Sequence, residues 1–166
     1  MIRECGCPSE SPEWHNQDID LAGQCIHTMP TSCFLHMPIA YELYAKRQQT
    51  EIENLELEEK WPGLSLTRSG MFRGQRIRLL THNRSASRRI SFLPGPFNVR
   101  VQIHKGNMST VQIPVREMSI GLIESGKRPK ELYISHLNCP NCMKTEGNDR
   151  IMLLRHWVDA PGLKRK

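Results

Sequence analysis

The sequence has no apolar run that approaches the roughly 18 residues of a membrane-spanning helix. Its longest apolar clusters, such as Cys33–Phe34–Leu35, are broken within a few positions by His, Pro or a charged residue. The first eight residues, Met-Ile-Arg-Glu-Cys-Gly-Cys-Pro, include an acid and lack the apolar centre of a signal peptide. These absences predict a cytoplasmic protein with no membrane partner.

Recognisable catalytic motifs are also missing. The sequence contains no G-x-S-x-G elbow, phosphate-binding glycine loop, H-E-x-x-H pair or dinucleotide fingerprint. His27, His36, His82 and His104 could each act as a base or a ligand, but a single histidine is more often an ordinary surface or core residue. The sequence therefore gives no positive evidence of an enzyme and favours a non-catalytic role.

Acidic residues are absent from one long segment. Residues 60–116 contain no Asp or Glu but hold eleven Lys and Arg, whereas residues 1–59 hold eleven acids and three bases. In an average protein about one residue in eight is acidic, so 57 residues without one form an unusual run. We divide the chain, as a single domain over 1–166, into an acidic helical part (1–59), a basic strand-rich part (60–116) and a cysteine-turn region (117–166).

The basic part is rich in arginine, whose planar guanidinium makes paired hydrogen bonds to phosphate. A nucleic-acid-binding surface is therefore the leading prediction, with DNA or RNA as the partner. Phe72 could stack on a base, although core packing is the expected role of such a residue. The predicted phosphate contacts are Arg73, Arg76, Arg78, Arg84, Arg88 and Arg89.

Two other interpretations of the same charges stay open. The acidic run at residues 51–59 could lie across the basic surface and neutralise it within the fold, or could bind a protein partner. Alternatively, the arginines could form a pocket for a small anion, as in a sensor or an enzyme. If the acidic run neutralises the basic surface or binds a protein partner, the protein would be an interaction subunit with no ligand of its own.

The six cysteines predict a metal site rather than disulfides, because a reducing cytoplasm disfavours disulfides. Cys139-Pro-Asn-Cys142 has the two-residue spacing that points both thiolates at one zinc ion, and Cys5-Gly-Cys7 is a second close pair. We predict a structural zinc held by Cys139, Cys142, Cys5 and Cys7. A redox pair and buried free thiols are the alternatives. Other candidate ligands are Cys25, His27, Cys33, His36, His136 and His156.

The apolar periodicity predicts an α+β fold: a small antiparallel sheet, one longer N-terminal helix and short C-terminal elements, stapled by the metal. A helix is expected over 38–58, ended by Trp61-Pro62-Gly63, and a second short helix over 115–125. Strict alternation predicts a β-hairpin over 97–115, with a turn at Lys105-Gly106-Asn107. Strands are also expected near 75–80, 89–93 and 131–137, and a strand or short helix over 150–158.

One short stretch resembles a known family. Arg84-Ser-Ala-Ser-Arg88-Arg89, followed by Glu117-Met-Ser119-Ile-Gly121, is similar to the paired motifs of PilZ domains. The second motif departs from the family pattern, since Glu117 stands in place of Asp or Asn and Gly121 comes one position early. The resemblance implies a sensor that binds a cyclic dinucleotide through Arg84 and Arg88, and it supports the small-anion alternative.

Overall fold

The computed structural model describes residues 3–83 and 85–163. It shows a mixed α/β fold built on one antiparallel nine-stranded sheet, with three α-helices in the part described. The helices are α1 (Tyr41–Asn54), α2 (Gln112–Glu124) and α3 (Pro140–Glu146). None of them is long and apolar enough to cross a membrane. The strands are β1 (Gln17–Asp20), β2 (Cys25–Phe34), β3 (Met37–Pro38), β4 (Ser65–Ser69), β5 (Arg73–Leu79), β6 (Ile90–Phe92), β7 (Asn98–Lys105), β8 (Lys127–His136) and β9 (Arg150–Asp159).

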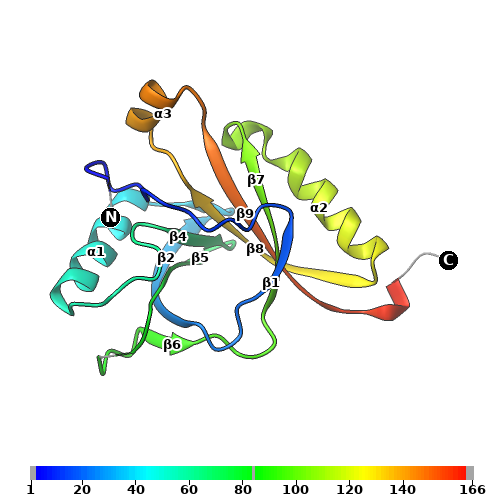
Figure 1. Ribbon diagram of the computed structural model, residues 1–166, viewed down its shortest axis with the longest axis horizontal. Helices are drawn as coiled ribbons and strands as arrows, with labels where there is room; N and C mark the ends of the chain where they lie inside the picture. The colour runs from blue at the N-terminus through cyan, green and yellow to red at the C-terminus, as the bar shows by residue number, and fades with distance from the viewer. Residues whose placement is uncertain (1–2, 84, 164–166) are drawn as a thin grey trace.

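The sheet order is β1-β7-β9-β8-β4-β5-β2-β3, with β6 paired to one end of β2. Strand β9 lies between β7 and β8 and is buried on both faces. Its residues Met152 and Leu154 join the main core, whereas Ile151 and Leu153 point to the side covered by α2. This explains why β9 is a nearly continuous apolar run rather than an alternating one. Figure 1 shows α2 along the β7–β9 side and α1 at the opposite end of the sheet.

The predicted hairpin over 97–115 is wrong in its second half. Strand β7 is present, but it pairs with β1 and β9, and the segment after it forms a 3₁₀ turn and then α2. Pro114 gives the physical reason, because it has no N–H to donate to a sheet. In the first turn of a helix that N–H has no partner anyway. Val111 and Val115 therefore pack beside Met118 at helical spacing.

The predicted helix over 38–58 is shorter, and its buried face differs from the prediction. Leu43 was expected on the apolar stripe but is exposed, and the fully buried positions of α1 are Gln48 and Ile52. Gln48 is buried because its amide group donates to His27 at 3.2 Å and to the Arg76 carbonyl at 3.1 Å. Pairing of a polar helix residue with the sheet leaves no signal in hydrophobic periodicity.

Candidate metal centre and cationic cleft

The C-terminal cysteine pair lies on a turn that becomes a helix. Cys139 precedes α3, which starts at Pro140 and is capped after Glu146 by Gly147, with φ of 74°. The backbone N–H groups of Cys142 and Asn141 point at the Cys139 sulfur and lower the pKa of that thiol. A C-x-x-C turn of this kind therefore favours thiolates, which are the form that binds metal.

The second pair lies on a tight turn near the N-terminus. Gly6 has φ of 84°, a conformation that favours glycine, and its N–H donates to the Arg3 carbonyl at 2.8 Å. The Arg3 N–H in turn donates to the Cys7 carbonyl at 2.9 Å. These bonds fold the turn so that the thiols of Cys5 and Cys7 face the same side.

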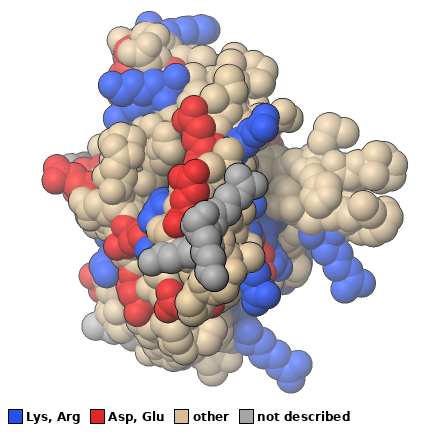
Figure 2. Space-filling model, turned by 90° about the vertical axis from the view of Figure 1, so that its right-hand side faces the viewer, with Lys and Arg blue, Asp and Glu red and all other residues tan. Residues whose placement is uncertain are grey.

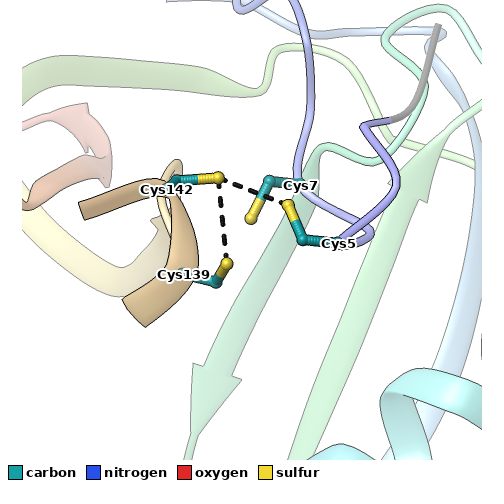
Figure 3. A group of neighbouring side chains, drawn as sticks. All are labelled: Cys5, Cys7, Cys139 and Cys142. Carbon is teal, nitrogen blue, oxygen red and sulfur yellow. Dashed lines mark hydrogen bonds between the residues drawn. The ribbon is translucent and has the colours of Figure 1, made fainter. Parts of the chain in front are cut away.

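The two pairs meet, as Figure 3 shows. The sulfur atoms of Cys5, Cys7, Cys139 and Cys142 all lie within 4.8 Å of one another, and in the described part of the chain they form the one cluster able to hold a metal ion. The Cys5–Cys142 distance is 3.3 Å and the Cys139–Cys142 distance is 3.8 Å. Tetrahedral zinc with bonds of about 2.3 Å would separate sulfurs by about 3.8 Å. The four cysteines could therefore bind a metal ion.

The surroundings of the four cysteines shift the pKa values of their thiols in opposite directions. Hydrogen bonds from the Cys5 thiol and the Arg3 guanidinium lower the pKa of Cys142 to about 6, whereas burial raises the pKa of Cys7. Glu146 anchors the surroundings, since it pairs with Arg3 at 2.5 Å and accepts a bond from the Asn138 amide at 3.2 Å. The cluster thus joins the N-terminal segment to the β8–β9 connection, which are far apart in sequence.

The other candidate ligands lie elsewhere. Cys25, His27 and Cys33 are buried along β2, and burial raises the pKa of Cys25. His156 stacks on Phe97 at 4.2 Å. None of these side chains joins the four-cysteine cluster in the described residues.

The predicted arginine surface is divided by the fold. Arg76 and Arg78 are buried, with only 4% and 3% of their surfaces exposed. Arg78 bonds to both carboxylate oxygens of Glu59, at 2.5 and 3.0 Å, and Arg89 pairs with Glu51 at 3.5 Å. Two acids of the 51–59 run therefore neutralise predicted phosphate contacts, as the self-neutralising interpretation requires.

The remaining predicted contacts are few. Arg73 and Arg88 are exposed, and Arg84 lies outside the described residues. Phe72 was expected in the core but is 64% exposed, which corrects that expectation. On the face of the molecule in Figure 2, acidic and basic side chains lie close together. Among the ion pairs of the fold, Asp18 pairs with both Arg100 and Lys127.

The buried ion pair makes a testable prediction. Glu59→Gln should destabilise the protein by about 3 kcal/mol, because it leaves the Arg78 guanidinium buried with a poorer partner. Chemical denaturation would measure this loss. The double change Arg78→Met with Glu59→Met should recover much of it, since no isolated charge remains. Arg88→Gln, at an exposed site, is the matched control, and an equal loss there would contradict the assignment.

A cationic cleft of about 860 Å³ opens beside α1 and the β4–β5 turn. Thr67 and Arg155 are among its lining residues, and each has a buried polar atom, the Thr67 hydroxyl and the Arg155 Nε, without a hydrogen-bond partner in the described structure. Burial lowers the pKa of Arg155. The charged and histidine side chains that line the cleft are mostly basic and come from several separate elements: His36, Arg68, Arg73, Lys130, Glu131, His136 and Arg155.

Two titratable residues at the cleft have lowered pKa values. Glu131 is the sole carboxylate in the described lining, and a hydrogen bond from His156 at 2.8 Å lowers its pKa. His136 lies edge-on to Tyr41, with ring centroids 6.4 Å apart. Desolvation lowers the pKa of the His136 imidazole, which favours its neutral form. The sequence analysis missed this cleft because its residues share no local motif.

A family model described as "Bacterial hydrolase" matches residues 2–156. The chain belongs to the bacterial hydrolase family. No curated protein and no solved structure matches the chain. Within this family member, the segment that resembled the second PilZ motif, Glu117–Gly121, lies inside α2 rather than in a turn. That observation removes the structural basis of the PilZ resemblance.

Proposed function

We propose that the protein is a zinc-stapled member of the hydrolase family whose cationic cleft binds a small anionic substrate. Zinc is favoured over other metals because four thiolates at tetrahedral spacing suit it and leave no oxygen ligand. A shell of four protein sulfurs has no open position for water, so the metal would have a structural role. Any hydrolytic chemistry therefore belongs to the cleft.

The observation that carries the proposal is the Arg155 guanidinium. It is partly buried, its Nε has no partner among the described residues, and Arg68, Arg73 and Lys130 line the same cleft. These basic groups outnumber the one carboxylate of the described lining, Glu131, so a positive charge remains. Positive charge that is partly buried is costly unless a bound anion compensates it. Phosphate or carboxylate groups are the ligands that arginine binds best.

The apolar part of the lining suggests the rest of the substrate. Tyr41, Met108, Leu132 and Ile134 line the cleft together with the basic groups. A ligand with an anionic group and an apolar portion would fit both. His136, which lines the cleft and whose pKa is lowered, is our candidate base for activating water.

Phenyl phosphate binding tests the cleft. Arg155→Met should weaken binding, measured by calorimetry, about ten- to a hundredfold, because a charge-assisted hydrogen bond contributes about 1.5–3 kcal/mol. Unfolding stability should change little, because the Nε of Arg155 has no hydrogen-bond partner to lose and Met keeps an apolar stem in its place. His136→Gln should leave binding nearly intact but abolish release of nitrophenolate from 4-nitrophenyl phosphate.

Arg128→Met is the control, since Arg128 is exposed on β8 and does not line the cleft. Wild-type protein that binds neither phosphate nor phenyl phosphate would contradict the cleft proposal. Retardation of DNA or RNA at low salt, lost in Arg88→Gln/Arg89→Gln but kept in Arg155→Met, would instead favour the nucleic-acid interface predicted from the sequence.

A further inference from the structure

Large apolar side chains gather, exposed, on two neighbouring turns. The β2–β3 turn carries Phe34, Leu35 and Met37, and the β4–β5 turn carries Met71 and Phe72. We call these five residues the tip patch. Each is at least half exposed, and such clusters in described surface positions mark contacts with a protein or a membrane.

The two turns lie side by side. Strands β2 and β5 pair so that Ser32 faces Arg73, and the Cys33 N–H donates to the Phe72 carbonyl at 3.0 Å. His36 approaches the Ser69 carbonyl at 3.4 Å, which links the same two turns again. The tip patch is therefore one continuous surface supported by the sheet, although its two parts are about 35 positions apart in the chain.

The β2–β3 turn uses residues that local folding does not favour. Leu35 and His36 have φ of 47° and 66°, the geometry of a two-residue turn that normally takes Asn-Gly. A leucine in this left-handed region is uncommon, and its side chain is 55% exposed. Neither turn preference nor burial explains Leu35, and residues in such sparsely populated conformations cluster at functional contacts.

The charge next to the patch is mostly positive, although Arg68 lies 3.9 Å from Glu131 of the cleft. Neither hairpin segment, 32–39 or 65–79, contains Asp or Glu, whereas Arg68 and Arg73 lie beside the β4–β5 turn. Both arginines also line the cleft, as do His36 and Gly70 of the turns. The patch thus combines protruding apolar tips with a basic rim at the mouth of the cleft.

We propose that the tip patch docks on an anionic lipid bilayer. Apolar turn residues would enter the boundary between headgroups and acyl chains, while Arg68 and Arg73 would bind the acidic headgroups. Two protruding tips suit a deformable bilayer surface, and the predominantly basic rim complements its negative potential. This goes beyond the expectation of no membrane partner, which rested on the lack of a spanning helix, and it does not depend on the ligand of the cleft.

Co-sedimentation with vesicles tests the docking surface. The metal-loaded protein should bind vesicles of phosphatidylcholine with phosphatidylglycerol and leave vesicles of phosphatidylcholine alone unbound. Phe72→Ser and Leu35→Asn should each lower the partition coefficient about tenfold, from the apolar area lost. Arg73→Gln should lower it about fivefold, the effect of one basic residue near an anionic surface.

Two features separate docking from damage to the fold. Leu35→Asn should keep the melting temperature, because Asn tolerates the left-handed turn conformation. Phe92→Ser is the matched control, since Phe92 is equally exposed on β6 but pairs with the opposite end of β2. Wild-type protein that does not co-sediment with anionic vesicles would overturn the proposal. So would equal loss in Phe92→Ser, or self-association that Leu35→Asn abolishes.

Discussion

Cys142→Ser should cost the protein its metal and most of its stability. Structural zinc sites contribute about 10–16 kcal/mol of apparent binding free energy, comparable to the total stability of a domain, about 5–15 kcal/mol. Here the cluster ties residues 5–7 to the β8–β9 connection, so its loss releases both segments. We expect about one zinc per wild-type chain by elemental analysis, from a single four-ligand site, and none in the variant.

The melting temperature supplies the second measurement. A strong chelator should lower it in the wild-type protein to the value of Cys142→Ser, and zinc should restore it in the wild type alone. Cys33→Ser is the control, because Cys33 is also a buried free thiol but lies outside the cluster. Metal-free protein with an unchanged melting temperature would contradict a structural metal.

The metal cluster could be predicted from sequence because its chemistry is local. Each pair, Cys5 with Cys7 and Cys139 with Cys142, has a spacing that one turn converts into two converging thiols. The two pairs could be assigned to one site because together they supply the four thiols of a complete tetrahedral shell. The identity of the metal and its effect on folding stay predictions.

The cleft and the tip patch could not be predicted in this way. Arg68 and Arg155 come from β4 and β9, which are not neighbours in the sheet, and reach the same cavity only through the order of the strands. Charge counting along the chain grouped Arg76 with Arg73 although one is buried and the other exposed. The alternation of residues within β5 does not reveal which of its faces packs against α1. The hydrogen bonds between Gln48 of α1 and Arg76 of β5 identify that face.

Strand β2 was missed for a different reason. Pro30 lies within it and argues against a strand, because proline cannot donate a sheet hydrogen bond. In the fold, Pro30 pairs with Gln75 of β5 on one side, while β6 covers only residues 25–27 on the other. The proline therefore occupies a part of β2 with an open edge, where it is tolerated.

Strand β7 was predicted correctly by alternation, and its inward face gives the second large effect. Val101 is completely buried in the main core, whereas its neighbour Gln102 is only partly buried. Val101→Asp should destabilise the protein by about 5 kcal/mol or more, from the lost apolar burial and the desolvated carboxyl group. Gln102→Asp should stay within about 1 kcal/mol of the wild type, as changes outside the core usually do.

Chemical denaturation of zinc-loaded protein would separate the two variants, with metal content checked to exclude loss of the cluster. The contrast depends on the register, in which Val101 pairs with Gln17 of β1 and Leu154 of β9. A one-residue shift of β7 would exchange its two faces and invert the result. Equal stability of Val101→Asp and Gln102→Asp would therefore show that β7 does not lie between β1 and β9 in this register.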